Sequence, residues 1–206
     1  MKRFKMNGMK EVKLIHYKDY ASGVTYCRYD IPEGIDPNRG SKLLPNTPLL
    51  IQVITIGDYN SALKLITEFD ADVNVTSNEI SQIGGNKPSN HTPLTTLIGT
   101  LKEISNQHTN SMLEMFLPRV DTAIKVLNLL LEKGANVNHQ DCMGFTALHL
   151  LINNNKIEAS TKLSILELLL KYGADNQLSM PKYGTPKDLA KLIELDTIQP
   201  EIYAKL

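Results

Sequence analysis

Apolar residues recur at helical spacing in two long segments of the chain, and a glycine follows each segment. The stretch AIKVLNLLLEK precedes Gly134, and the stretch LSILELLLKY precedes Gly173. A glycine after an apolar helix supplies the left-handed residue that ends the helix. Each segment is therefore predicted to be a helix that stops at its glycine, with a polar turn beyond it.

A second motif opens a new apolar run twelve residues after each of these glycines, at Thr146 and Thr185. Thr47 and Thr92 begin similar runs, and a proline follows Thr47, Thr92 and Thr185. A threonine caps a helix because its hydroxyl accepts a hydrogen bond from a free backbone N–H, and proline fits the first helical position, where a missing N–H costs nothing. The sequence therefore predicts that a helix opens at each of the four threonines.

The helix-opening and helix-ending motifs alternate, which indicates a repeat architecture. These residues resemble ankyrin repeats, whose pattern runs Thr-Pro-Leu-His, a short helix, a leucine-rich helix, Gly-Ala-Asp-Val-Asn and a hairpin finger. The best copy spans roughly 141–173, and the resemblance covers about 34–195. It implies a mainly α fold: an ankyrin-repeat solenoid of stacked helix pairs with β-hairpin or loop fingers. The predicted units are an N-terminal extension or cap at 1–40, repeats at about 42–86, 87–140 and 141–179, and a capping repeat at 180–206.

The first two repeats depart from this pattern. Asp70 replaces the terminating glycine of the first repeat, which also lacks the histidine after Leu49. The finger that follows is about ten residues longer than usual. In the second repeat, TLKEISNQHTNSMLEMFLPRV keeps apolar residues at helical spacing on both sides of a polar turn. It predicts two helices lengthened into a protruding hairpin, whose apolar residues either pack together or form an exposed patch at Met112, Met115 and Phe116.

The N-terminal segment alternates apolar and polar residues on both sides of Ala21-Ser22-Gly23, which predicts a β-hairpin. Two interpretations of this hairpin stay open. It covers the end of the first repeat, which would otherwise expose its core, or it presents a tyrosine-lined contact surface. The tyrosines in question are Tyr17, Tyr20, Tyr26 and Tyr29.

Composition narrows the classes of function. The chain has 206 residues, 42% of them hydrophobic, and 22 basic residues balance 22 acidic ones. Zero net charge removes the whole-chain electrostatic argument for binding nucleic acid. No run of eighteen apolar residues occurs, so no membrane insertion is expected. Two cysteines more than a hundred residues apart suit a reducing compartment, so the predicted location is the cytoplasm.

The chain offers little catalytic chemistry. The cysteines and histidines lack zinc spacing, so neither a metal nor a cofactor is predicted. The stretch GGNKP lacks the spacing of a phosphate-binding loop. A cysteine hydrolase needs a thiol, a base and an orienting group, and Cys27 with His16 and Asp30 is the only such set whose members lie close together in the sequence. The resemblance gives His149 a structural role, with hydrogen bonds within and between neighbouring turns.

The resemblance implies a non-catalytic module that binds a partner protein through finger loops and a concave face. The alternative is an enzyme with a small N-terminal catalytic segment, whose repeats recognise the substrate protein. Small divergent ankyrin proteins with this composition also resemble effectors that intracellular bacteria secrete into the host cytosol. By resemblance, the contact positions are Lys87, Asn90, His91, His139, Gln140, Cys142, Met143, Phe145, Met180, Lys182 and Tyr183.

Overall fold

The computed structural model describes residues 11–18, 25–81, 87–102 and 120–206. This part of the chain is mainly helical, with two small antiparallel sheets. The strands are β1 (Lys13–Lys18), β2 (Thr25–Asp30), β3 (Ile80–Ser81) and β4 (Lys87–Pro88). The helices are α1 (Leu49–Thr55), α2 (Tyr59–Glu68), α3 (Pro93–Thr100), α4 (Val120–Glu132), α5 (Ala147–Asn153), α6 (Ala159–Lys171), α7 (Pro186–Leu192), α8 (Leu195–Ile198) and α9 (Pro200–Tyr203).

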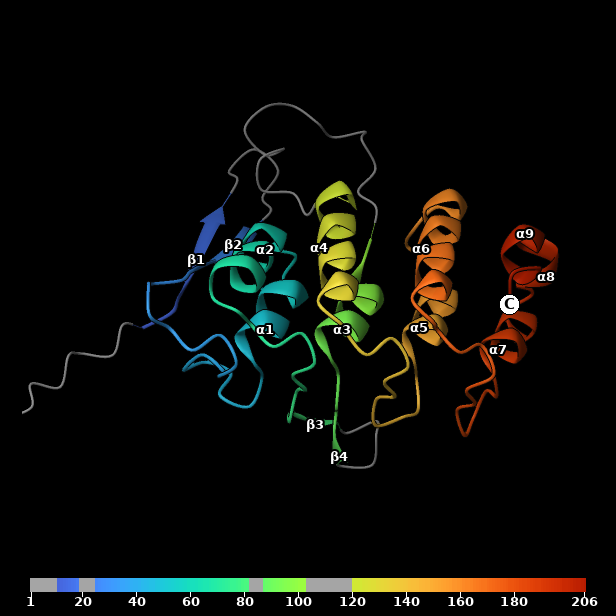
Figure 1. The fold of residues 1–206 in the computed structure, drawn as a ribbon, viewed down its shortest axis with the longest axis horizontal. Coiled ribbons are helices and arrows are strands. Elements are labelled where there is room, and N and C mark those ends of the chain that lie inside the picture. Colours follow the sequence, from blue (N-terminus) through green and yellow to red (C-terminus); the bar gives the residue numbers. More distant parts are fainter. Residues whose placement is uncertain (1–10, 19–24, 82–86, 103–119) are drawn as a thin grey trace, which may run out of the picture.

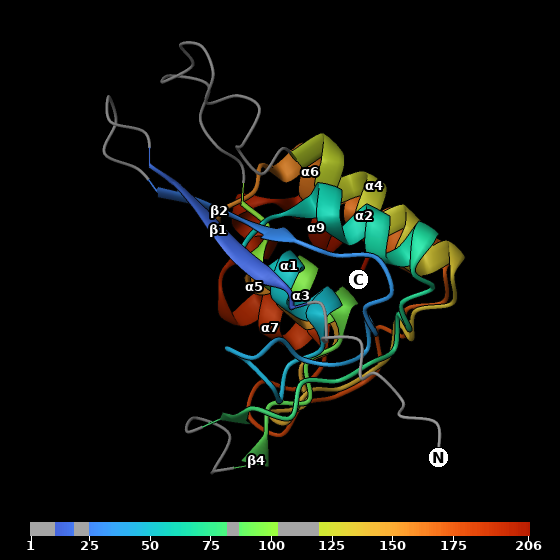
Figure 2. The same cartoon turned by 90° about the vertical axis from the view of Figure 1, so that its left-hand side faces the viewer.

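The helices form two layers, which Figure 1 shows from the side and Figure 2 from the end. The short helices α1, α3, α5 and α7 lie in a row, and each contacts the next. The second layer contains α2, α4, α6 and α9, with contacts between α2 and α4 and between α6 and α9. Each of the first three short helices contacts the helix that follows it in the chain. Long loops extend on the side of the short helices, away from the second layer (Figure 1).

A helix begins within two residues of each of the four predicted threonines, and three of the threonines are confirmed as caps. Thr92, Thr146 and Thr185 are N-caps, and each accepts a hydrogen bond from the backbone N–H three residues later. In all three, the side chain of that later residue also accepts from the backbone N–H of the threonine, which completes a capping box. The third-position residue is threonine, histidine or aspartate, so several polar residues serve this purpose.

Thr47 does not cap a helix, which corrects the prediction there. The cap position of α1 is Pro48, without a side-chain hydrogen bond. Leu50 occupies the place that a polar residue holds in the three capping boxes, and it has no group that could reach back. The Thr47 hydroxyl lies instead 3.3 Å from the Ser77 hydroxyl of the next loop.

Left-handed residues end the long helices, as the sequence predicts. Gly134 follows α4 with φ at 84°, and Gly173 follows α6 with φ at 85°. After α6, the N–H of Ala174 donates to the Leu169 carbonyl at 3.0 Å, so the last turn is closed by backbone hydrogen bonds. Asp70 takes the same left-handed conformation after α2, with φ at 51°. A side chain makes this conformation less favourable than it is for glycine.

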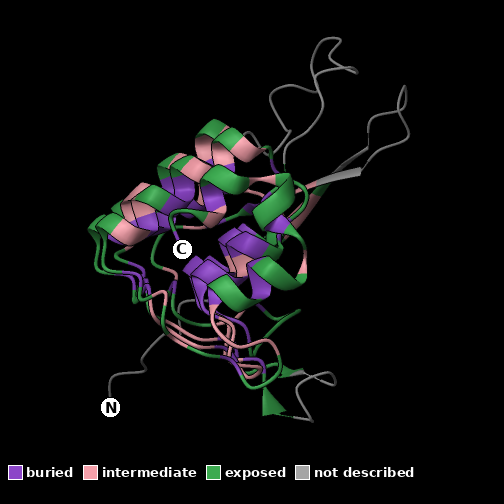
Figure 3. Cartoon of the chain, turned by 90° about the vertical axis from the view of Figure 1, so that its right-hand side faces the viewer, coloured by how far each residue is buried: buried purple, intermediate pink, exposed green. Residues whose placement is uncertain are grey.

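A continuous apolar core lies between the two layers, and Figure 3 shows buried residues in purple in both of them. It includes residues from β2, from both helix layers and from the C-terminal turn, so one core extends along the row of helices. Fully buried leucines such as Leu97, Leu130 and Leu166 supply its centre. Their burial from both sides stabilises neighbouring helix pairs against one another.

The predicted N-terminal hairpin is confirmed, and it is tied to the first helix pair through Tyr29. Strands β1 and β2 are antiparallel. The backbone N–H of Tyr29 donates to Asp58 Oδ2 at 3.0 Å, and its hydroxyl donates to Gln52 Oε1 at 3.0 Å. The Tyr29 side chain is buried, with 5% of its surface exposed. It therefore helps to cover the end of the core and does not belong to an exposed tyrosine surface.

The second helix pair differs from the predicted protruding hairpin in its first half. Helix α3 ends at Thr100, and Leu101 has an extended backbone with ψ at 131°. Asn154 donates from Nδ2 to the carbonyls of Ile98 and Leu101, at 3.0 and 2.8 Å. This side chain satisfies carbonyls that a longer helix would need for its own next turn. The predicted patch of Met112, Met115 and Phe116 lies outside the described residues.

Candidate partner-binding surface

Four loops, which we call fingers, extend from the bases of the helix pairs. Their described residues are 34–47, 70–81 with 87–91, 134–145 and 173–184, and the fingers are numbered 1 to 4 in chain order. Finger 2 carries the small sheet of β3 and β4, in which Ile80 is opposite Pro88 and Ser81 is opposite Lys87. The motif beginning at Gly34 opens finger 1, with φ of Gly34 at 78°.

A ladder of side-chain hydrogen bonds joins the bases of the fingers. Asn38 Oδ1 accepts from the backbone N–H of Asp72 at 2.8 Å, and Asn74 Oδ1 accepts from that of Asn136 at 2.7 Å. The third step runs from the N–H of Asp175 to Asn138 Oδ1, at 2.8 Å. Asn74 and Asn138 also donate from Nδ2 to the carbonyls of the two helix-ending glycines, Gly134 and Gly173. Successive fingers therefore lie in the same register, one beside the next.

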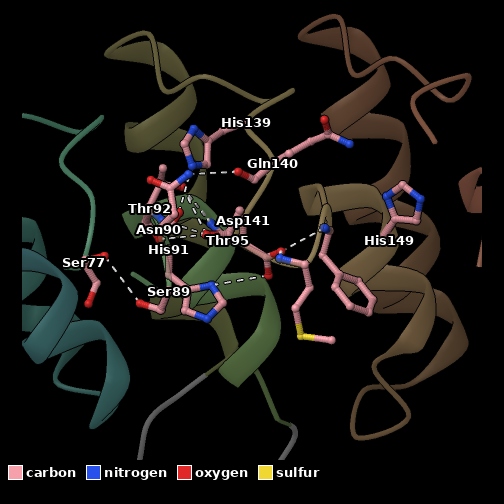
Figure 4. A network of polar contacts seen from close by, with 12 residues as sticks. Ser77, Ser89, Asn90, His91, Thr92, Thr95, His139, Gln140, Asp141 and His149 are labelled. Carbon is pink, nitrogen blue, oxygen red and sulfur yellow. Dashed lines mark hydrogen bonds and ion pairs between the residues drawn. The ribbon is translucent and has the colours of Figure 1, made fainter. Parts of the chain in front are cut away.

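Fingers 2 and 3 are joined further out by a second group of polar contacts, shown in Figure 4. Asn90 Nδ2 donates to the Gln140 carbonyl at 3.1 Å, and His139 Nε2 lies 2.8 Å from the Asn90 carbonyl. His91 Nδ1 lies 3.7 Å from Asp141 Oδ2, with the Asp141 side chain only 3% exposed (Figure 4). The other oxygen of this carboxylate accepts two backbone N–H groups of its own turn, from Met143 and Phe145. Asp141 thereby shapes the tip of finger 3 and connects it to finger 2.

His149 links the helix pair of α5 and α6 to finger 4. Its Nδ1 accepts from the backbone N–H of Thr146, and its Nε2 lies 3.0 Å from the carbonyl of Gly184. A carbonyl can only accept, so Nε2 carries the hydrogen and the ring is neutral. Burial lowers the pKa of His149 below its ordinary value, which keeps the neutral form in place. Gln140 adds a second contact by donating from Nε2 to the Ser179 carbonyl.

A comparison with protein families identifies part of this arrangement. The ankyrin repeat model matches residues 143–179. This chain contains an ankyrin repeat. The matched segment contains α5, α6 and most of finger 4, and it includes nearly all of the best copy predicted from the sequence. A search of curated proteins finds no match to the chain.

The predicted contact residues of the fingers differ widely in exposure. Lys87 and Lys182 are exposed. The half-buried ones are Asn90, His91, His139, Gln140, Cys142, Met143, Phe145 and Tyr183. Asn90, His139 and Gln140 already use polar groups in contacts between fingers. These residues therefore join neighbouring fingers, whereas their contact with a partner stays a prediction.

Aromatic residues form a small cluster between fingers 3 and 4. The Phe145 ring lies edge-on to His149, with 6.1 Å between centroids, and 6.4 Å from the Tyr183 ring. Lys182 Nζ lies 4.9 Å from the centre of the Tyr183 ring. Met180 is only 1% exposed, which corrects its assignment as a contact residue. It lies against Gly144, where an added Cβ would come within 3.2 Å of it, so it packs finger 4 onto finger 3.

Sequence reasoning missed the exposed apolar side chains of the first two fingers. Leu43 and Leu44 of finger 1 are 69% and 40% exposed, and Ile80 of finger 2 is 60% exposed. The backbone N–H of Asn78 donates to the Asn46 carbonyl at 2.9 Å, which holds the two fingers side by side. The pair Leu43-Leu44 just before Pro45 was a usable signal, because adjacent leucines are unusual in a polar loop.

The proposed cysteine hydrolase set is only partly assembled. Cys27 Sγ lies 3.1 Å from His16 Nδ1, across the hairpin. Asp30 is opposite Lys13 and lies an odd number of residues from Cys27, so the two point to opposite faces of the strand pair. Asp30 therefore cannot orient His16. Within the described ranges, no three metal-ligating side chains cluster, and no helix has the length and apolarity needed to cross a bilayer.

The N-terminal tyrosines contribute less to a candidate surface than their number indicates. Tyr29 is buried, and Tyr20 lies outside the described residues. The backbone register places Tyr17 opposite Tyr26. A tyrosine-lined contact surface at these two positions stays a prediction.

Proposed function

We propose that the chain is a non-catalytic protein-binding module whose four helix pairs form an ankyrin solenoid and whose fingers bind a partner protein. One observation carries the proposal: hydrogen bonds join all four fingers side by side, so their outward side chains belong to a single surface. The protein itself satisfies the polar groups that join the fingers, so the surface is organised before a partner arrives. A preorganised surface loses little conformational entropy on binding.

The exposed apolar side chains support the same proposal. Leu43, Leu44 and Ile80 lie on neighbouring fingers, while the half-buried Phe145 and Tyr183 lie at the other end of the row. Aromatic and apolar anchors in a polar frame are typical of protein interfaces. The lysines of the fingers, among them Lys87 and Lys182, supply exposed positive charge around these anchors.

Site-specific photo-crosslinking tests the proposal without disturbing the core. A photoreactive amino acid replaces Lys87 or Lys182 on the fingers, and in matched controls it replaces Lys125 on α4 or Lys171 on α6, all of which are exposed. In extracts of cells that naturally contain the protein, the finger positions should give one defined protein adduct, and the outer-helix positions should not. Equal adducts at all four positions, or adducts only from the outer helices, would contradict the proposal.

We further propose that the partner is a host protein and that the chain acts as an effector in the cytosol of an infected cell. This part rests on the composition and on the resemblance to small divergent ankyrin proteins. Detection of the chain in host cytosol during infection, with a bacterial cytoplasmic protein as the fractionation control, tests it. Retention of the chain inside the bacterium would reject the effector role and leave the binding function unaffected.

A further inference from the structure

We propose that Cys27 is a nucleophilic thiol, activated by His16, that forms a reversible mixed disulfide with small disulfide molecules. The proposal concerns the N-terminal hairpin and is independent of partner binding by the fingers. It assigns a covalent modification site to Cys27, with an aliphatic or aromatic disulfide as the reagent class. Catalytic turnover forms no part of it.

The contact between thiol and imidazole follows from strand pairing. His16 of β1 is directly opposite Cys27 of β2, and their side-chain atoms Nδ1 and Sγ are 3.1 Å apart. Directly opposed residues of an antiparallel pair point to the same face, with Cβ atoms about 5 Å apart. A shift of the register by one residue would send the side chains of one strand to the other face. The native register therefore holds the two side chains on one face, within reach of each other.

An independent anchor fixes that register. Tyr29 lies two residues after Cys27, on the same face, and is held by Asp58 and by the buried Gln52. Leu14, which is opposite Tyr29, packs against the core. The Tyr29 and Leu14 end of this face is thus fixed on the first helix pair. The next pair along, Cys27 and His16, lies at the margin of the core.

That marginal position leaves the thiol accessible. Cys27 is half-buried and His16 is exposed, so a small molecule can approach the sulfur while the imidazole stays in contact with it. A reactive cysteine requires both an adjacent basic or positively charged group and access to solvent. Cys142 provides the comparison within the same chain, because it is also half-buried. Among the residues that the structure describes, no imidazole hydrogen bonds to its thiol, so it lacks the adjacent base.

The reagent disulfide is itself the oxidant, since one of its sulfurs is reduced to a thiol as Cys27 is oxidised. The imidazole nitrogen accepts the thiol proton, and the Cys27 sulfur attacks one sulfur of the reagent R–S–S–R. A new S–S bond joins Cys27 to one half of the reagent as the original S–S bond breaks. The departing thiolate takes the proton from the imidazolium and leaves as R–SH. A second free thiol reverses the sequence and restores the protein.

Single-cysteine variants of the full chain test the proposal. Cys142→Ser leaves Cys27 alone, and Cys27→Ser leaves Cys142 alone. Each variant is treated at neutral pH in the presence of a chelator. In one assay the reagent is an aromatic disulfide that releases a coloured thiol. In the other it is glutathione disulfide, and intact-protein mass spectrometry detects the adduct. Cys27 should react about tenfold faster than Cys142, or more, since a positioned base contributes at least that factor.

The variant His16→Gln in the Cys142→Ser background separates activation from exposure. It should slow Cys27 to about the rate of Cys142, while circular dichroism stays unchanged. Both cysteines should react equally fast in denaturant, where the pairing is lost. Equal rates for the two cysteines in the native protein would overturn the proposal. An unchanged Cys27 rate in His16→Gln would overturn it as well.

Discussion

Gln52 is the polar residue on which the first helix pair depends most, and its replacement by leucine should be strongly destabilising. It lies in α1 with 1% of its surface exposed. Its Oε1 accepts from the hydroxyls of Tyr29 and Ser41, at 3.0 and 2.7 Å. Its Nε2 donates to the carbonyls of Leu44 and Thr47, at 2.9 and 2.6 Å. One side chain therefore joins the hairpin, finger 1 and the first helix through four hydrogen bonds.

The magnitude follows from the groups that Gln52→Leu leaves behind. The hydroxyls of Tyr29 and Ser41 lose their shared acceptor and can pair only with each other, and the carbonyl of Thr47 loses its donor; all three residues are buried. The Leu44 carbonyl keeps a hydrogen bond from the Thr47 N–H. Each unsatisfied buried group costs about 1 to 3 kcal/mol, and the leucine recovers part of this by apolar packing. We expect a loss of about 3 to 5 kcal/mol in the free energy of unfolding.

Urea denaturation followed by far-ultraviolet circular dichroism measures this loss, and a double-mutant cycle tests its cause. Tyr29→Phe alone should cost about 1 kcal/mol, because it removes one hydrogen bond while Gln52 keeps its other partners. In the Gln52→Leu background the same change should cost nothing or should stabilise, since it removes a hydroxyl that has lost its acceptor. If Tyr29→Phe costs the same in both backgrounds, the network explanation is wrong.

Three further predictions concern single positions. Asp70→Gly should raise the free energy of unfolding by about 0.5 to 1 kcal/mol in urea denaturation, because Asp70 has a left-handed backbone, whereas Asp72→Gly, at an exposed position with negative φ, should not. Asn154→Asp should lower the free energy of unfolding by about 2 to 4 kcal/mol, because a carboxylate would face two carbonyls at the end of α3. Thermal denaturation measures this loss, and Asn155→Asp, at an exposed position, is the control. Since burial lowers the pKa of His149, the unfolded chain binds more protons than the folded chain below about pH 6.5, and stability falls as the pH drops. His149→Thr, which copies the capping box of α3, should flatten this part of the curve of stability against pH. An unchanged slope would contradict this explanation.

The sequence predicted the features that depend on local chemistry. Thr92, Thr146 and Thr185 cap helices because each is followed three residues later by a side chain able to complete the box. Thr47 lacks such a residue, and the prediction was wrong there because it considered the threonine and proline alone. The left-handed conformation of Gly134 and Gly173 was predictable for the same reason, since it depends on the residue and on the end of the helix before it.

Features that depend on distant partners were out of reach of the sequence. Spacing extended the second repeat's first helix beyond Thr100, whereas Asn154, which contacts the end of that helix, comes from the next repeat. The sequence places Met180 among the exposed finger residues, because its burial depends on Gly144 of finger 3. The sequence groups His16 with Cys27, but the 3.1 Å contact between Nδ1 and Sγ depends on the strand register. That the fingers carry the binding surface stays a prediction.

The arrangement of contacts explains how repeats of unequal length can share one architecture. The three steps of the asparagine ladder join residues 34, 62 and 37 positions apart in the sequence, yet their hydrogen bonds are 2.7 to 2.8 Å long in every case. In the sequence, the longest step includes the segment between β3 and β4 and the segment between α3 and α4, and the ladder residues lie outside both segments. Stacking therefore requires the helix ends and the finger bases to keep their spacing. Exposed finger residues that take no part in the contacts between fingers can differ without loss of the ladder.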